Sequence, residues 1–150
     1  MKRRTINPGY PSKTSSMSLK CIHPEGISTP ETFTHVIVSK GSKIVFIAGQ
    51  VAEDSNGKLV GAGDMVAQSR QVFANLGRCL EAAGARPDRV TKLTILVANY
   101  KRDYLPMIEE GRVSLFGDHK PADTLVGVAA LSRPDYMLEV DAVAVIDEDE

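Results

Sequence analysis

Apolar residues recur along the chain with two spacings, one typical of β-strands and one typical of α-helices. Two runs rich in β-branched residues, 36–38 and 44–47, flank a short turn that contains Gly41. This pattern predicts a β-hairpin within residues 34–49. Three later segments have the composition or the alternation of strands: residues 90–97, 123–131 and 137–146.

Two other segments predict amphipathic helices. Asp64 is a predicted N-cap, apolar side chains follow at helical spacing over residues 65–83, and Gly84 ends the helix as its C′ residue. Residues 102–116 predict a second helix, in which Pro106 fits only in the first turn. The order β-β-α-β-α-β-β indicates an α+β sheet with both helices on one face. An uncovered apolar face is unfavourable in water, so the pattern also indicates self-assembly.

Composition narrows the class of protein. The chain has 150 residues, 43% of them hydrophobic and 25% charged, which is typical of one soluble globular domain. No apolar run approaches the roughly 18 residues of a membrane span. A net charge of -1 argues against a dedicated nucleic-acid-binding protein. Cys21 and Cys79 are too few for a disulfide scaffold, and we expect a cytoplasmic protein.

The two ends of the chain carry opposite charges. Residues 1–16 contain basic side chains and no acid, and no apolar stretch follows them, so we expect an N-terminal extension and not a secretory signal. Residues 17–150 then form a single domain. The chain closes on four acids, residues 147–150, which we expect to be a solvated tail.

Acidic residues interrupt the last two predicted strands. Glu139 and Asp141 are two positions apart, so they lie on the same face of their strand. Asp123 begins the preceding strand-like run, and if those two strands pair, Asp123 and one of the other acids share a pocket. Clustered carboxylates shift each other's pKa and suit acid–base catalysis. The alternative is a solvated or ion-paired face at a sheet edge, and the residues alone leave both interpretations open.

Neither a metal site nor a phosphate cofactor is expected. The three histidines, His23, His35 and His119, are far apart in sequence and none has a partner four residues away. Residues 61–63 contain two glycines before a predicted helix but lack the spacing of a nucleotide-binding loop.

Seven stretches agree in order and spacing with one protein family. They are residues 33–35 (FTH), 47–50 (IAGQ), 68–76 (QSRQVFANL), 80–85 (LEAAGA), 90–94 (VTKLT), 120–122 (KPA) and 138–145 (LEVDAVAV). On these stretches the chain resembles the Rid family, the YjgF-like reactive-intermediate deaminases. The resemblance implies a chorismate-mutase-like α+β fold, a mixed β-sheet with two helices on one face. It also implies a homotrimer with a central barrel, and small-molecule substrates bound at the subunit interfaces. Enamines or imines would be hydrolysed to ketones and ammonia without cofactor or metal.

The resemblance also assigns site residues, with departures from the family pattern. Active members have Pro-Ala-Arg-Ser where this chain has residues 121–124, so the substrate-binding arginine is replaced by Asp123. The family's glutamate, thought to position or activate water, matches Glu139. The predicted catalytic residues are therefore Glu139 and Asp123. The predicted substrate-binding residues are Phe33 in place of a tyrosine, Ala48 in place of a serine, Ile108 near the position of an asparagine, Thr124 and Leu125.

Two hypotheses follow from these departures. In the first, the pocket is catalytic but retuned: Glu139 activates water or transfers a proton, and Asp123 favours a neutral or cationic substrate because it repels a carboxylate. In the second, the protein is a non-catalytic trimer that binds a metabolite or a protein. Contact with RNA has little support, because the net charge is -1 and aromatic stacking platforms are missing from the sequence.

Overall fold

The computed structural model describes residues 18–148. The predicted N-terminal extension, residues 1–16, and the last two residues of the acidic tail lie outside this range. In chain order the elements are β1 (Ser18–Ile22), β2 (Val36–Lys40), β3 (Lys43–Gln50), α1 (Met65–Ala82), a short 3-10 helix (Pro87–Arg89), β4 (Val90–Ala98), α2 (Tyr104–Phe116), β5 (Ala122–Val128) and β6 (Leu138–Ile146). Neither of the two α-helices in the described range is both long and apolar enough to cross a membrane.

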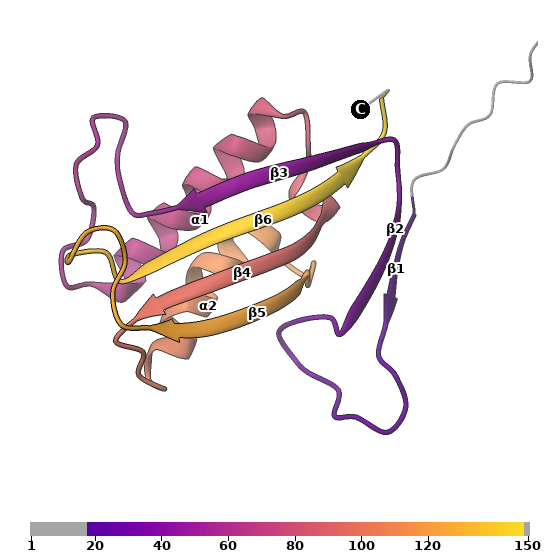
Figure 1. Cartoon of the computed structure of the whole chain (residues 1–150), viewed down its shortest axis with the longest axis horizontal. Coiled ribbons are helices and arrows are strands. Elements are labelled where there is room, and N and C mark those ends of the chain that lie inside the picture. The colour runs from indigo at the N-terminus through magenta and orange to yellow at the C-terminus, as the bar shows by residue number, and fades with distance from the viewer. Residues whose placement is uncertain (1–17, 149–150) are drawn as a thin grey trace, which may run out of the picture.

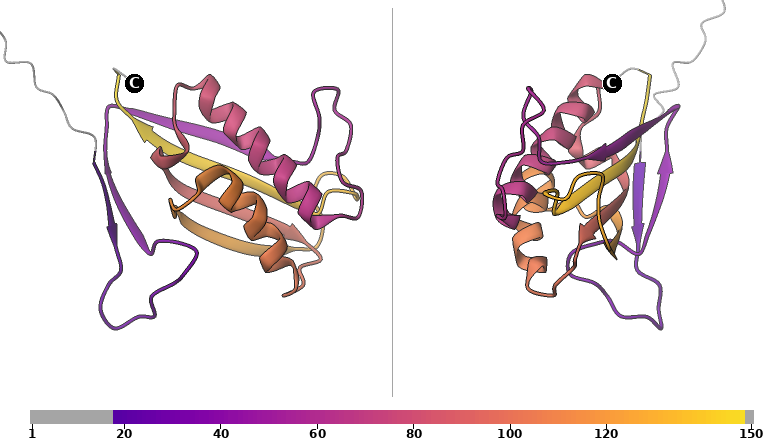
Figure 2. Two further views of the ribbon diagram at one scale, coloured as in Figure 1. Left: turned by 180° about the vertical axis from the view of Figure 1, so that it is seen from behind. Right: turned by 60° about the vertical axis from the view of Figure 1, so that its left-hand side comes forward.

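The strands form two sheets (Figure 1). β1 and β2 pair antiparallel, while the main sheet has the order β3-β6-β4-β5. β4 and β5 are parallel and are connected through α2, whereas β6 runs antiparallel to both of its neighbours. Both helices lie on one face of the main sheet, as the view from behind shows (Figure 2). The predicted α+β fold, with a mixed sheet and two helices on one face, is confirmed.

The predicted hairpin is wrong, although both of its strands exist. β2 and β3 belong to different sheets, and β3 pairs with β6 instead. The chain turns tightly at Gly41 against the end of β6, where the Ser42 amide donates a hydrogen bond of 3.1 Å to the Ile146 carbonyl. This contact directs β3 along β6 and leaves β2 to pair with β1, a strand that the sequence did not predict. The predicted strand 123–131 is also too long, since β5 ends at Val128.

The helices follow their local sequence signals. The Asp64 side chain caps α1 by accepting a hydrogen bond of 3.0 Å from the Ala67 amide, and Gly84 follows the helix with φ +71°. α2 packs closely on α1 at Gly111, where a Cβ atom would lie 2.6 Å from the Ser69 carbonyl oxygen. The Ser69 hydroxyl donates to the Ile108 carbonyl at 2.9 Å. These contacts fix the rotation of α2, and therefore which of its side chains face β5.

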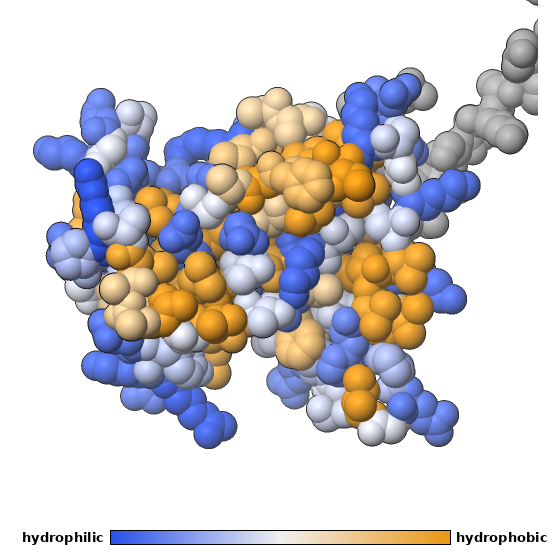
Figure 3. All heavy atoms as spheres, viewed as in Figure 1, coloured by the Kyte–Doolittle hydropathy of each residue, from blue (hydrophilic) through white to orange (hydrophobic). Residues whose placement is uncertain are grey.

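The opposite face of the main sheet has no helix over it. Along β6, every second residue from Leu138 to Ile146 is buried beneath the helices, so Glu139 and Asp141 point to the uncovered face. On that face Phe46 is 77% exposed and Ile44 is 62% exposed. Figure 3 views this face and shows apolar side chains over β3 and near the ends of β4 and β5, with polar side chains between them. The self-assembly expected from the sequence remains a prediction, and this surface is what motivates it.

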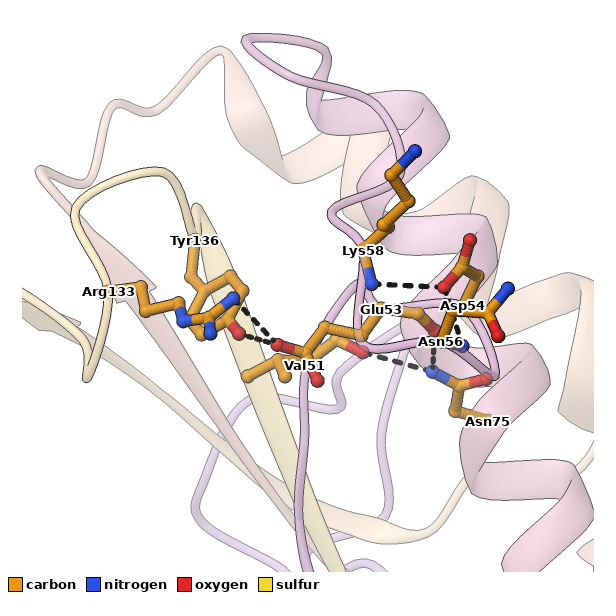
Figure 4. A network of polar contacts seen from close by, with 8 residues as sticks. All are labelled: Val51, Glu53, Asp54, Asn56, Lys58, Asn75, Arg133 and Tyr136. Carbon is orange, nitrogen blue, oxygen red and sulfur yellow. Dashed lines mark hydrogen bonds and ion pairs between the residues drawn. The ribbon is translucent and has the colours of Figure 1, made fainter.

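A polar network fixes the end of the sheet where β3 finishes and β6 begins (Figure 4). The Glu53 carboxylate accepts hydrogen bonds from the Tyr136 hydroxyl and the Arg133 guanidinium. The Asn75 amide on α1 donates to the carbonyls of Val51 and Glu53 at 3.0 and 2.9 Å. The loop after β3 is thus tied to both α1 and the loop before β6, which holds the neighbouring ends of those strands in place.

Candidate functional site

A pocket of about 320 Å³ lies between β5, α2 and the segment before β2. Five of the seven predicted site residues line it: Phe33, Ile108, Asp123, Thr124 and Leu125. Its volume is at the small end of the range for ligand sites. The structure therefore brings most of the predicted residues into a single cavity.

Phe33 reaches this pocket because the next residue is bonded to the chain just before β5. The Thr34 amide donates to the Pro121 carbonyl at 3.1 Å, and the Thr34 hydroxyl donates to the Lys120 carbonyl at 2.5 Å. Thr34 is only 4% exposed, so both hydrogen bonds are protected from water. A loop residue far from β5 in sequence is thereby held next to Asp123.

Asp123 faces the helix side of the sheet. It pairs in register with Leu93, which pairs in turn with Ala142, and both of these residues are buried beneath the helices. The pKa of Asp123 is raised to about 6, chiefly because burial disfavours the charged form. The positive charges of Arg112 and Lys92 oppose this shift, and the negative charge of Glu109 makes a smaller contribution in the same direction as burial. Within residues 18–148, its carboxylate accepts no hydrogen bond and forms no ion pair. Its oxygens are therefore available to a ligand.

A buried ion pair on α2 lines the same pocket. Arg112 is 4% exposed, and its guanidinium donates to both carboxylate oxygens of Glu109, with Nε at 2.7 Å from Oε2. A further guanidinium nitrogen donates to the His119 carbonyl at 3.3 Å. Sequence reasoning missed these two residues. Their spacing of three predicts an ordinary ion pair on a helix surface, and only the packing of α2 turns it toward the pocket.

Glu139 and Ala48 do not lie in this pocket. β4 separates β5 from β6, and Glu139 pairs with Leu96 on the uncovered face. Asp123 and Glu139 therefore project from opposite faces of one sheet, and the condition for a shared pocket within a single chain is not met. Glu139 instead lies over Gly49, where a Cβ atom would be 2.7 Å from its carboxyl carbon. Gly49 is thus the residue that makes room for this carboxylate.

A second, wider groove of about 700 Å³ lies along the β3 edge, between the loop after β3 and α1. Gly49 and Gln50 line it together with Asn75, Arg78 and Cys79. No group of three His, Cys, Asp or Glu side chains suited to hold a metal ion occurs in residues 18–148. The two cavities thus lie at the two edges of the main sheet, β5 and β3.

The fold and these motifs match a known family. The family model described as Endoribonuclease L-PSP matches residues 26–146, which is most of the chain. The chain belongs to the Rid/YjgF/L-PSP family. The family resemblance seen in the sequence is thereby confirmed.

Relatives of this Rid/YjgF/L-PSP chain include named deaminases. The chain is 32% identical to 3-aminoacrylate deaminase RutC of Acinetobacter baylyi, over 85% of this chain and 98% of that protein. It is 36% identical to the 2-iminobutanoate/2-iminopropanoate deaminase of Mus musculus, over 69% of this chain and 74% of that protein. Among solved structures, a Rid-family protein of unknown function from Yersinia pestis, YyfB, superposes with a TM-score of 0.79 at 36% identity. That match covers 85% of this chain and 98% of the other.

Proposed function

We propose that the protein hydrolyses imines, enamines or related C–N bonds without a cofactor, and that its pocket favours neutral or cationic substrates over 2-imino acids. Two relatives are deaminases by name, one for 3-aminoacrylate and one for 2-imino acids, which supports the reaction class. The single observation that supports the change in preference is the Asp123 carboxylate, which lines the pocket without a hydrogen-bond or ion-pair partner in the described range. A desolvated like charge repels a substrate carboxylate by several kcal/mol.

The proposed site is completed by a second copy of the chain. Asp123 lies on β5 and Ala48 on β3, the two edge strands of the main sheet, and Glu139 is on β6 next to β3. In a homotrimer whose uncovered sheet faces meet, the β5 edge of one protomer would lie near the β3 edge of the next. Glu139 of one copy would then reach the Asp123 pocket of its neighbour, and burial of exposed Phe46 and Ile44 would favour the assembly.

The roles of the two acids follow from the reaction. A water molecule adds to the carbon of the C=N bond, losing one proton, while the nitrogen gains one. The resulting carbinolamine breaks its C–N bond to give a carbonyl compound and ammonia. Glu139 takes one proton from the attacking water and passes it to the nitrogen, as a general base and then a general acid. When the C–N bond breaks, the carbinolamine hydroxyl loses its proton to the same carboxylate, which passes it to the departing nitrogen, so that ammonia leaves and the C=O bond forms. Asp123 binds the N–H or iminium group and holds the C=N bond in position.

Ammonia release from a panel of imines tests this proposal. We expect wild-type protein to release ammonia from a simple alkyl imine generated in solution, and to be much slower with 2-iminopropanoate. Glu139→Gln should lower kcat by roughly 100-fold or more, because the general base is lost. Asp141→Asn is the matched control, since Asp141 shares the strand and the face of Glu139. Turnover of 2-iminopropanoate as fast as by an arginine-bearing relative would contradict the assigned role of Asp123.

A non-catalytic binding protein is the second candidate. The observation that favours it is the apolar character of three positions in the pocket, Phe33, Ile108 and Leu125, which offer a ligand no side-chain polar group. Under this alternative, a small ligand binds but no member of the imine panel releases ammonia. Failure of Glu139→Gln to change any rate would favour it over the hydrolase.

A further inference from the structure

The charged groups that line the Asp123 pocket differ in whether they already have a partner. Three ionisable groups line the cavity: Glu109 and Arg112 from α2, and Asp123 from β5. Lys92 also influences Asp123, but its ammonium group donates to the Thr124 hydroxyl at 2.7 Å and is not part of the cavity lining. The formal charge of the lining is therefore -1, and the ligand that binds depends on which of these groups has no partner within the described part of the protein.

Arg112 is already committed to a partner. Its Nε and one terminal nitrogen donate hydrogen bonds to the two carboxylate oxygens of Glu109, and its other terminal nitrogen donates a hydrogen bond to the His119 carbonyl. A bidentate arginine–carboxylate pair is among the stronger polar contacts in proteins. An anionic ligand would have to compete with Glu109 for this guanidinium and would also face Asp123. The buried arginine is thus unavailable as a carboxylate receptor.

Asp123 is in the opposite situation. It lines the pocket without a hydrogen bond or ion pair to any residue between 18 and 148. Apolar side chains also line the pocket, among them Phe33, Leu105 and Ile108. A ligand with a positively charged group and an apolar group would suit this pocket. The charged group would pair with the Asp123 carboxylate, and the apolar group would pack against these side chains. An aromatic ring such as Phe33 also attracts a nearby cation.

We propose that this pocket selects small organic cations that carry an apolar group, and that Glu109 is a specificity-determining residue because it occupies the guanidinium of Arg112. The inference rests on the proposed function only in using the same pocket. Among substrates it favours iminium ions over neutral imines, it expects ammonium ions to bind without reacting, and it assigns Glu109 a role in excluding carboxylates.

The first test compares three ligands of similar size, each with one phenyl ring, and of different charge. Benzylammonium, benzyl alcohol and benzoate are titrated into the full-length wild-type protein by NMR at about pH 7.5, where Asp123 is ionised. We expect benzylammonium to bind at least about tenfold more tightly than benzoate, with the alcohol between them. Benzoate binding as tightly as benzylammonium, or more so, would overturn the proposal.

The second test exchanges the charges. Asp123→Asn should reduce benzylammonium affinity about tenfold without creating benzoate affinity, because Glu109 still occupies Arg112. The double variant Asp123→Asn/Glu109→Gln should bind benzoate about tenfold more tightly than Asp123→Asn alone. Glu110→Gln is the control, since Glu110 is the next residue on α2 and pairs with exposed Arg70 outside the pocket. Unchanged benzoate affinity in a folded double variant would refute the role of Glu109.

Circular dichroism verifies that each variant folds. If the double variant does not fold, the relative affinities of wild type and Asp123→Asn for benzylammonium and benzoate test the proposed selectivity. Ligand selectivity and imine hydrolysis are measured separately, so either proposal can fail while the other holds. Selective benzylammonium binding without any imine hydrolysis would support the inference and refute the hydrolase. Imine hydrolysis that benzoate inhibits better than benzylammonium would support the hydrolase and refute the inference.

Discussion

At the scale of single residues, Asp123 occupies a position that is unfavourable for the folded state. Its carboxylate is partly buried, and this desolvation raises its pKa from 3.8 to about 6, although the positive charges of Arg112 and Lys92 oppose the shift. The folded protein therefore binds a proton more readily than the unfolded chain between these two values. Stability falls as the pH rises through this window and stays lower above it. A ligand cation would offset this cost, since it would pair directly with a carboxylate that has no ion-pair partner among residues 18–148.

Removing the Asp123 charge should therefore stabilise the protein. We expect Asp123→Asn to raise the free energy of unfolding by roughly 1 to 2 kcal/mol near pH 7.5, allowing for partial solvent screening of the group. Near pH 4 the gain should almost vanish, because Asp123 is already protonated in the folded state. Urea denaturation at both pH values measures the difference, and Asp118→Asn, an exposed site, is the control. A gain equal at both pH values would contradict the electrostatic cause.

Gly49 shows how a missing side chain can serve a functional group. A Cβ atom there would collide with the carboxylate end of Glu139, which is flexible and can move aside. We expect Gly49→Ala to change the free energy of unfolding by less than about 0.5 kcal/mol but to lower the proposed hydrolysis about tenfold or more, since the acid is displaced. Thermal melts and ammonia release measure the two effects separately. Full activity in Gly49→Ala would show that Glu139 does not need its present position.

At the scale of elements, the packing of α2 on α1 decides what the pocket contains. Gly111 of α2 lies against the backbone of Ser69, and this close approach sets the rotation of the helix. The same rotation turns Glu109 and Arg112 toward β5. The charge pattern of the pocket therefore depends on a helix contact outside the pocket itself.

Enlarging Gly111 should disturb both helices. A Cβ atom there would meet backbone atoms of Ser69 at 2.6 Å, and backbone cannot yield as a side chain does. We expect Gly111→Ala to destabilise the protein by about 1 to 3 kcal/mol, the usual range for overpacking. Chemical denaturation measures this value, with Val113→Ala on the exposed side of α2 as the control. Equal stability of Gly111→Ala and wild type would mean that the helices are not held this closely.

The elements also show which features a sequence can predict. α1 was predicted almost to its ends because Asp64 and Gly84 act locally, through a cap and a positive φ. The hairpin was wrong because β-branched runs specify a strand but not its partner, and the partner of β3 is β6, about 100 residues away. Five of the residues predicted from the sequence line one pocket. Arg112 also lines it but was not predicted, because the orientation of its side chain is set by tertiary packing.

At the scale of the whole molecule, the uncovered sheet face exposes apolar side chains that would be more stable if they were buried. Exposed Phe46 and Ile44 lie on β3, and Val126 on β5 is 40% exposed on the same face. Large exposed apolar patches on a folded chain mark interaction sites. A second copy is the occupant that would also bring Glu139 to the Asp123 pocket.

A charge placed on this face should prevent the proposed assembly. We expect wild-type protein to be a trimer by size-exclusion chromatography with light scattering, and Phe46→Glu to be a folded monomer, because a buried unpaired charge is costly. Val113→Glu, on the exposed side of α2, should remain a trimer. A monomeric wild type would contradict both the assembly and the shared site.

The placement of Asp123 and Glu139 on opposite faces has a consequence for mixtures of chains. If each reaction centre takes one acid from each of two neighbours, two inactive variants can compensate for each other. Preparations that contain both Asp123→Ala and Glu139→Gln chains in equal amounts, refolded together, would form some centres with both wild-type acids. Random assembly gives about one quarter of the interfaces this composition, since each contact is head-to-tail. The protein would then behave genetically as a system with complementation between alleles.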